Sequence, residues 1–251
     1  MLTSETLDKP DQSAPGQSPG ALGNIDLVIF DCDGVLIDSE PIASRTLAEA
    51  LQRAGVAITP AEAHIRFTGN SESVIRQMCA EDFGIADIGS LFAEWHEHLY
   101  AEFARSLAAM PGMEQVIAGI HRPKCVASNS TLKRLRLSLG HLPLWQLFTP
   151  QVFSAEQVGR PKPAPDLLLY CAQQLSVVPE KCVMIDDSPH GVEAARAAGM
   201  LAIGFVDPND PRPQRQALLT KAGAFAVATG AGELNDILNA ADRALAPKAE
   251  K

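Results

Sequence analysis

Two pairs of acidic residues in the chain could do chemistry. Asp31 and Asp33 follow one apolar run, and Asp186 and Asp187 follow another. Carboxylates this close repel one another, so such a pair needs a bound cation or a proton. A hard divalent cation with oxygen ligands, above all Mg²⁺, would resolve the conflict at the first pair. One carboxylate could then attack an electrophile while its neighbour exchanged a proton with the leaving group.

Buried strands must position these carboxylates. Residues 25–30 are predicted to form a strand that is buried on both faces, because nearly every position is apolar. Residues 181–185 are predicted to form another buried strand. Open α/β sheets bind their ligands at the carboxyl ends of such strands, and Gly34 permits a sharp turn after the first pair. The alternative is a solvated Asp pair in an ordinary loop, and the first pair alone leaves it open.

Two further segments carry groups suited to an anion. Ser128 and Asn129 lie where a strand predicted at residues 124–128 gives way to a helix predicted at 131–140. Hydroxyl and backbone N–H donors at a helix amino terminus favour phosphate, although ordinary helix capping explains the same residues. Lys162 stands in a loop with three prolines, which would hold its ammonium in place to neutralise phosphate oxygens or a carboxylate. A solvated loop lysine is the alternative.

The middle of the first half of the chain differs from the rest, because it shows helical spacing and no convincing strand. Helices are expected to begin at Pro41, at Thr59, at Ser71 or Ser73, and at Asp87. We therefore divide the chain into a disordered tail at 1–22, a core at 23–40 and 110–251, and a helical insert at 41–109.

The order of the remaining elements indicates an α/β fold. Strands that alternate with helices predict a doubly wound parallel sheet. Beyond the segments above we expect helices near 113–121, 166–175, 192–198 and 232–245, strands near 148–154, 200–206 and 224–228, and a surface loop at 208–213.

Composition excludes several classes of protein. A net charge of −9 disfavours nucleic acid as a partner, since phosphate backbones need basic surface. The five cysteines form no Cys-x-x-Cys pair, so a zinc site and a disulfide framework are both disfavoured and a reducing cytoplasm is expected. No apolar run is long enough to span a membrane, and residues 1–22 lack the pattern of a signal peptide.

The first acidic motif, Asp31-Cys32-Asp33-Gly34-Val35-Leu36, resembles the first motif of the haloacid dehalogenase (HAD) superfamily of phosphotransferases. Ser128 matches its second motif, Lys162 its third, and Asp186-Asp187-Ser188 its fourth, in the family's order. The resemblance covers roughly residues 24–230. It implies a Rossmann-like core with an inserted helical cap.

The resemblance also implies a role for each residue. Asp31 would be the nucleophile and Asp33 the general acid/base. Ser128, the Asn129 backbone amide and Lys162 would bind the transferring phosphoryl group. Mg²⁺ would be held by the Asp31 side chain, the Asp33 backbone carbonyl and Asp187, with Asp186 a more variable partner that often binds through water.

The helical insert is similar to the cap of the β-phosphoglucomutase and phosphoglycolate phosphatase branch, which closes over the site. A helical subdomain without a gating role is the alternative. In this insert the loop Thr68–Ser71 is the best candidate to touch a substrate, whereas His64, Arg66, His96 and His98 are interpreted as surface or packing residues.

The resemblance implies a phosphatase acting on a small phosphorylated metabolite through an aspartyl phosphate. The β-phosphoglucomutases carry a His and an Arg where this chain has Ala43 and Glu72, so hydrolysis is favoured over the mutase alternative. The motifs also resemble those of bacterial sugar-phosphate phosphatases, including the 6-phosphogluconate type. A non-catalytic HAD-like binding protein is the alternative from another class, and a monomer or weak dimer is expected.

Overall fold

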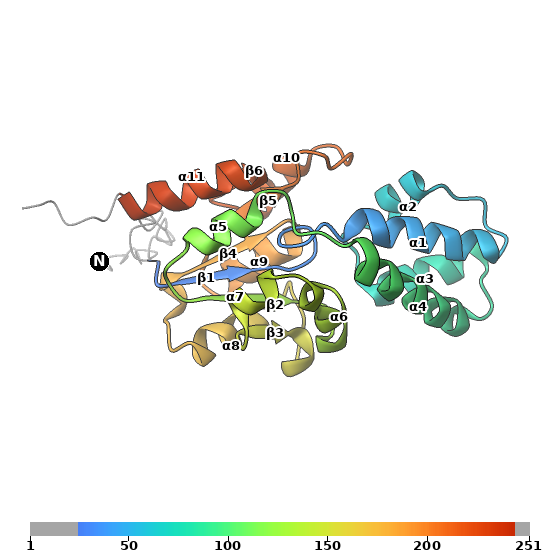
Figure 1. Ribbon diagram of the computed structural model, residues 1–251, viewed down its shortest axis with the longest axis horizontal. Helices are drawn as coiled ribbons and strands as arrows, with labels where there is room; N and C mark the ends of the chain where they lie inside the picture. Colours follow the sequence, from blue (N-terminus) through green and yellow to red (C-terminus); the bar gives the residue numbers. More distant parts are fainter. Residues whose placement is uncertain (1–24, 244–251) are drawn as a thin grey trace, which may run out of the picture.

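The computed structural model describes residues 25–243, which form a parallel sheet between helices and a helical bundle beside it (Figure 1). The sheet in these residues has six strands in the order β3-β2-β1-β4-β5-β6, and every neighbouring pair is parallel. The strands are β1 Leu27–Phe30, β2 Lys124–Ser128, β3 Val152–Ser154, β4 Cys182–Asp186, β5 Leu201–Val206 and β6 Ala226–Thr229. The expected α/β fold is confirmed, and the short strand β3 lies at an edge of the sheet.

Strand β1 lies at the centre of the sheet and is buried on both faces. Its side chains alternate between two hydrophobic clusters, with Val28 and Phe30 in one and Leu27 and Ile29 in the other. This alternation is the two-residue period of an extended strand. An apolar residue at every position is therefore what a central strand of a parallel sheet requires.

Helices cover both faces of the sheet, as the doubly wound prediction requires. Helices α8 Asp166–Gln174, α9 Pro189–Ala197 and α10 Arg215–Ala222 contribute buried residues to the Leu27 side. The Phe30 side receives buried residues from α5 Met113–Gly119, α6 Leu132–Leu137, α7 Leu144–Phe148 and α11 Gly230–Arg243. Short 3-10 turns occur at Leu139–His141 (η2), Ala155–Gln157 (η3) and Pro179–Lys181 (η4).

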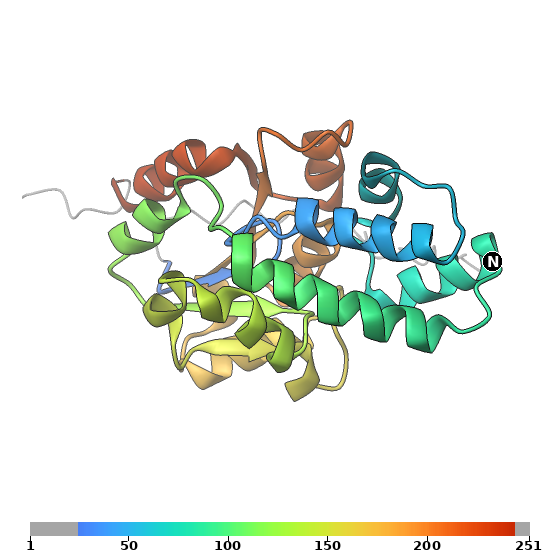
Figure 2. The ribbon, with the colours of Figure 1, turned by 45° about the vertical axis from the view of Figure 1, so that its right-hand side comes forward.

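The helical bundle is inserted between β1 and α5, and both views place it to one side of the sheet (Figures 1 and 2). Its caps follow the sequence signals, because the side chains of Thr59, Ser71 and Asp87 each accept a backbone N–H of the helix that they precede. Ser71 rather than Ser73 therefore begins the third helix. The helices are α1 Glu40–Arg53, α2 Pro60–Phe67, α3 Glu72–Phe83 and α4 Ile88–Ser106. The domain boundaries themselves stay a prediction.

Helices α7 and α10 were not expected from the sequence. Helix α7 has five residues, too few to show a periodic pattern, and in α10 only Leu219 is buried. The helix expected at 131–140 ends at Leu137 and gives way to η2. The predicted tail at 1–22 lies outside the described residues.

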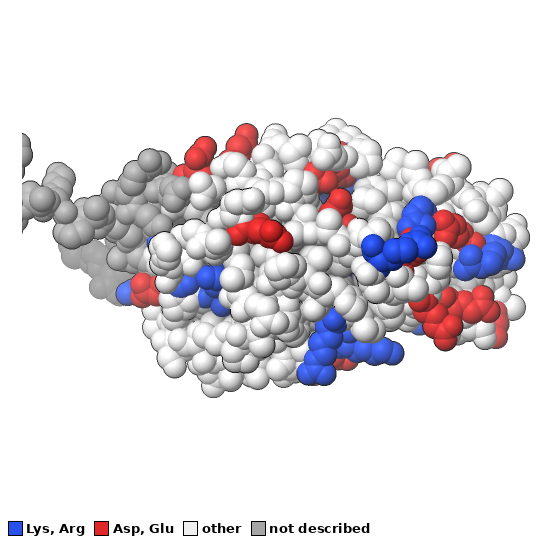
Figure 3. Space-filling view, viewed as in Figure 1, with Lys and Arg blue, Asp and Glu red and all other residues white. Residues whose placement is uncertain are grey.

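The surface of the bundle mixes charges of both signs. On the face shown in Figure 3, basic side chains stand beside acidic ones rather than forming a broad basic patch. Several of these charges are paired within the bundle, including Arg45 with Glu49 and Glu102. All five cysteines fall within residues 25–243 and are buried as free thiols. Among the helices described, none is both long and apolar enough to cross a membrane.

Candidate active site

The two acidic pairs meet at the carboxyl ends of β1 and β4. Phe30 and Ile185 are partners in the parallel register of these strands, so Asp31 and Asp186 follow at the same edge of the sheet. Carboxylate oxygens of Asp31, Asp186 and Asp187 all lie within 4.8 Å of one another, and the three residues are buried. The geometry therefore brings Asp31 of the first pair together with both acids of the second, while the roles expected of these residues stay a prediction.

The ammonium of Lys162 lies inside this cluster. Its Nζ donates to Asp31 Oδ1 at 2.8 Å, to Asp186 Oδ2 at 2.7 Å and to the carbonyl oxygen of Ala127 at 3.1 Å. Burial alone would lower the pKa of Lys162, but the charges of Asp186 and Asp31 outweigh it and raise that pKa. Lys162 is thus a buried cation rather than the solvated loop lysine of the alternative interpretation.

Carboxyl groups outnumber the ammonium in this cluster. Burial raises the pKa of Asp31 to about 7, with Lys162 opposing the rise and Asp186 adding to it. Burial, and then the charges of Glu40 and Asp186, hold the pKa of Asp187 well above its usual range. Three buried carboxylates this close together are a donor set that a hard divalent cation such as Mg²⁺ fits.

Asp33 lies in a different environment from Asp31. Its carboxylate accepts hydrogen bonds from Ser39 Oγ at 2.6 Å, Ser130 Oγ at 2.9 Å and Arg134 Nη2 at 3.0 Å. Although burial would raise its pKa, the charge of Arg134 and these hydrogen bonds lower it. Two acids two residues apart therefore lie in environments that shift their pKa values in opposite directions.

Ser128 and Asn129 end β2 beside the cluster. Ser128 is buried, and its Oγ accepts the backbone N–H of Ser130 at 3.1 Å. The Asn129 side chain accepts the backbone N–H of Lys162 at 2.9 Å and donates to the Lys162 carbonyl at 3.0 Å. The Asn129 side chain therefore holds the loop that carries Lys162 (the lysine loop) against the end of β2. The role expected of its backbone amide stays a prediction.

Two glycines allow the close packing of the acidic segments. Gly34 has φ +75°, and a Cβ on it would lie 3.0 Å from Cγ of Asp187. A Cβ at Gly191 would overlap the carboxylate of Asp186. Side chains at these two positions would push the acidic pairs out of the cluster.

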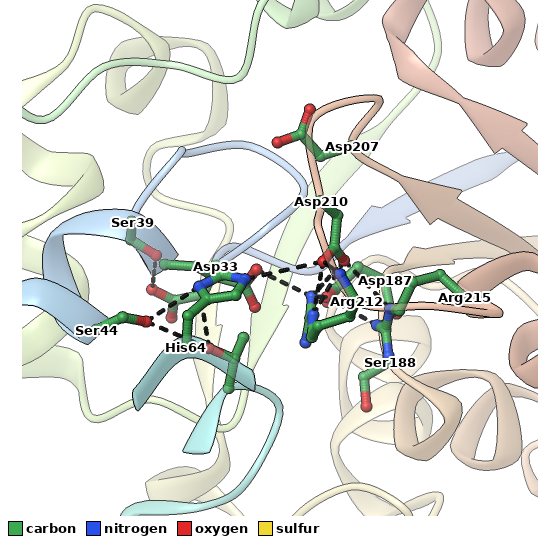
Figure 4. Close-up of polar contacts among 12 residues, drawn as sticks. Asp33, Ser39, Ser44, His64, Asp187, Ser188, Asp207, Asp210, Arg212 and Arg215 are labelled. Carbon is green, nitrogen blue, oxygen red and sulfur yellow. Dashed lines mark hydrogen bonds and ion pairs between the residues drawn. The ribbon is translucent and has the colours of Figure 1, made fainter. Parts of the chain in front are cut away.

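The segment between β5 and α10 also reaches this site, which the sequence did not indicate (Figure 4). Arg215 donates to the backbone oxygen of Asp187 and lies 3.4 Å from its Oδ2. Arg212 donates to Asp210 at 2.7 Å and to Glu40 at 3.0 Å. The side chains of Asp210 and Arg212 are only 5% and 9% exposed, because ion pairs draw them inward. The prediction of a surface loop at 208–213 is therefore wrong for these two side chains.

The bundle contributes a cavity of about 110 Å³ at the first turn of α1. It is lined by the start of α1 and by the loop after α2. These segments contribute Ser39, Glu40 and Ala43, and Thr68, Gly69 and Asn70, respectively. The candidate loop thus lines a cavity, while its contact with a substrate stays a prediction. Arg66, His96 and His98 instead form ion pairs with Asp82, Glu72 and Glu49.

Comparison with known proteins identifies the family. The model of the haloacid dehalogenase-like hydrolases matches residues 25–199. The chain belongs to this family, and it is an enzyme of the hydrolase class, as the sequence motifs predicted.

Individual relatives agree with this assignment. The chain is 33% identical to the 6-phosphogluconate phosphatase of Escherichia coli, over 75% of this chain and 86% of the relative. It is 34% identical to the fructose-1-phosphate phosphatase of the same organism, over 70% of this chain and 94% of the relative. The solved structure of a putative β-phosphoglucomutase from Thermotoga maritima superposes with a TM-score of 0.71 at 29% identity, covering 88% of this chain and all of that one.

Proposed function

We propose that the protein is a Mg²⁺-dependent phosphatase that hydrolyses a small phosphate monoester, a sugar phosphate, through an aspartyl phosphate on Asp31. The observation that carries the proposal is the buried cluster in which Lys162 bonds both Asp31 and Asp186 beside Asp187. Relatives named as sugar-phosphate phosphatases support it.

The metal would be held by Asp31, Asp187 and the backbone carbonyl of Asp33, where it would neutralise charge on the phosphate. Asp186 suits an indirect role, because both of its oxygens already accept hydrogen bonds. Its Oδ2 accepts from Lys162 and its Oδ1 from the backbone N–H of Ser188 at 2.9 Å.

The side chains of the cluster would carry out two displacements at phosphorus. Asp31 attacks with the carboxylate oxygen that Lys162 does not bind, so that a phosphorus–oxygen bond to Asp31 forms as the ester bond breaks. Asp33 protonates the departing alkoxide. It then takes a proton from the water that attacks the aspartyl phosphate, which restores Asp31 and releases inorganic phosphate.

Three groups would hold the phosphoryl oxygens during both displacements. Lys162 supplies a fixed positive charge, and its position is set by Asn129 and by the acids around it. Ser128 Oγ and the Asn129 backbone N–H lie at the carboxyl end of the neighbouring strand β2. Donors fixed before the reaction stabilise the charge that develops in the transition state without reorganising.

A phosphomutase is the second candidate, because the Thermotoga maritima neighbour is named as a putative β-phosphoglucomutase. A mutase must hold a second phosphate with cations of the cap. Ala43, at the position of the mutase histidine, lines the cavity without any charge. Glu72, at the position of the mutase arginine, is an acid that pairs with Arg76 and His96. These residues favour hydrolysis.

Assays of p-nitrophenyl phosphate and a panel of sugar phosphates, with and without Mg²⁺, test the proposal. We expect Mg²⁺-dependent release of inorganic phosphate, and loss of that activity in Asp31→Asn. Transfer of phosphate within a sugar would indicate the mutase, and absence of turnover with every ester would indicate a binding protein. The cytoplasmic location and the monomer or weak dimer stay predictions from the sequence.

A further inference from the structure

A polar cluster lies where the helical bundle meets the core, beside the acidic site (Figure 4). His64 of α2 comes from the bundle, and Asp210 and Arg212 come from the segment between β5 and α10. Nδ1 of His64 lies 3.1 Å from Ser44 Oγ and 3.4 Å from Thr68 Oγ1. Its Nε2 lies 3.8 Å from Asp210 Oδ1, which is too far for a hydrogen bond.

Arg212 has one end of its guanidinium occupied and the other free. Its Nε and Nη2 donate to Asp210, and Nη2 also donates to Glu40. Neither Nη1 of Arg212 nor Nε2 of His64 has a hydrogen-bond partner within residues 25–243, although both atoms are buried. Buried donors are normally paired with protein, water or a ligand, so two unpaired nitrogens near one carboxylate indicate a place for an oxygen atom.

The unpaired end of Arg212 lies next to a loop that lines the cavity of the bundle. A Cβ on Gly69 would lie 3.6 Å from Nη1, and Gly69 lines that cavity together with Glu40 and Thr68. The other end of the same guanidinium, Nη2, lies 3.8 Å from Asp187 Oδ2. Arg212 therefore lies within reach of both the acidic site and the cavity, where the leaving part of a phosphate ester would extend.

The charged groups around this position do not form a positive site, because two arginines face three acids. Arg212 forms ion pairs with Glu40 and Asp210, and Arg215 forms ion pairs with Asp187 and Asp210. A second phosphate would meet these acids without enough positive charge to hold it. A hydroxyl group suits the site, because its oxygen can accept from Arg212 or His64 while its hydrogen is donated to Glu40 or Asp210.

We propose that Arg212 and His64 bind hydroxyl groups of the leaving part of the substrate and so select polyhydroxylated phosphate monoesters. The inference rests on the proposed function and deepens it by assigning specificity to a core segment as well as to the bundle. We assign His64 the tautomer in which Nδ1 accepts from Ser44 Oγ and Nε2 carries the hydrogen, so that Nε2 can donate to a ligand. An ester without hydroxyl groups leaves both donors unpaired, and a sugar bisphosphate brings the wrong charge.

The test compares two esters with the same number of carbons, sorbitol 6-phosphate and hexyl phosphate. Wild type should have the higher kcat/KM for the hexitol ester and should prefer fructose 6-phosphate over fructose 1,6-bisphosphate. In Arg212→Met and in His64→Leu, the ratio of kcat/KM for the two six-carbon esters should fall by about tenfold or more. His64→Gln should restore part of the ratio, because its amide can donate.

Arg66→Met is the matched control. Arg66 lies on the same helix as His64 but pairs with Asp82 at an exposed position, so its loss should leave the ratio unchanged. Arg212 adjoins the acidic site and His64 does not, so a change of ratio in His64→Leu cannot be attributed to disruption of that site. The inference is overturned if both variants keep the wild-type ratio, or if wild type prefers hexyl phosphate or the bisphosphate. Failure of wild type to hydrolyse p-nitrophenyl phosphate would instead overturn the proposed function.

Discussion

The ammonium of Lys162 lies 2.8 Å from the carboxylate of Asp31, although the two residues are 131 positions apart in the chain. The same ammonium bonds Asp186 at the end of the neighbouring strand. One buried cation thus joins acids from β1 and β4. Among the described residues, three carboxylates surround this one ammonium, so the cluster is suited to a further cation. An anionic substrate could then be held by the ammonium and that cation together.

Replacing Lys162 with Met should separate catalysis from folding. We expect kcat to fall by about 10²–10³, the usual cost of losing one fixed group that stabilises the transition state. The metal-free variant should also unfold more easily than metal-free wild type, since its buried acids lose their ammonium. Steady-state kinetics and thermal unfolding in EDTA measure the two effects. Wild-type kcat in Lys162→Met would remove the lysine from the mechanism.

Mg²⁺ should stabilise the protein more as the pH rises. The pKa of Asp31 is raised from 3.8 to about 7, so the metal-free fold loses stability as the pH rises through that range. Mg²⁺ must displace protons from the carboxyls below about pH 7 and meets little competition above it. The increase in Tm on adding Mg²⁺ should therefore be larger at about pH 8 than at about pH 5.5.

The control for this pH dependence is Asp187→Asn, which removes a second carboxyl of raised pKa. Its Mg²⁺-induced change in Tm should be smaller and should depend less on pH. Equal changes in wild type at both pH values would argue against binding of the metal at these carboxyls.

Asn129 should matter through its side chain. Asn129→Ala removes two hydrogen bonds to the backbone of Lys162, each worth about 0.5–1.5 kcal/mol, so unfolding should become easier by about 1–3 kcal/mol. Activity should fall as well, because the lysine loop is no longer fastened to β2. Asn129→Asp keeps the acceptor for the Lys162 N–H and should lose less stability. Denaturant unfolding that shows no difference between Asn129→Ala and wild type would contradict the contact.

Arg134 should set the pH dependence of the general acid. It lowers the pKa of Asp33, against the effect of burial, so Arg134→Met should raise that pKa. A general acid loses its proton as the pH rises through its pKa, so the alkaline fall in kcat/KM for a sugar phosphate should move to higher pH in the variant. With p-nitrophenyl phosphate, whose leaving group needs little protonation, the shift should be smaller. Identical pH profiles of variant and wild type would count against Asp33 as the acid.

The acids could be singled out from the sequence because a local pattern marks them. Asp31 and Asp186 each follow an apolar run that is typical of a central parallel strand, and strands in register bring their ends together. Local patterns also singled out Lys162, which stands in a proline-rich loop, and Asn129, which directly follows a strand. The mutual hydrogen bonds of Asn129 and Lys162 could not be predicted, because nothing local shows the two segments touching.

The residues that the sequence did not reveal act through distant contacts. Glu40 and Arg212 are 172 positions apart, and Asp33 and Arg134 are 101 apart. Arg212 stands among prolines and polar residues that are typical of a solvated loop, and only the packed fold shows that its side chain is turned inward. Ser39 and Ser130 adjoin motif residues, but their hydrogen bonds to Asp33 depend on the same tertiary packing.

The central claim is that Asp31 takes the phosphoryl group. The most direct measurement is to quench wild type in acid during turnover of its best sugar phosphate and to locate the phosphoryl group by peptide mass spectrometry, with Asp31→Asn as the control. We predict a phosphoryl group on Asp31 in wild type and none in the control. A phosphoryl group on another residue, or continued turnover by Asp31→Asn, would contradict the account.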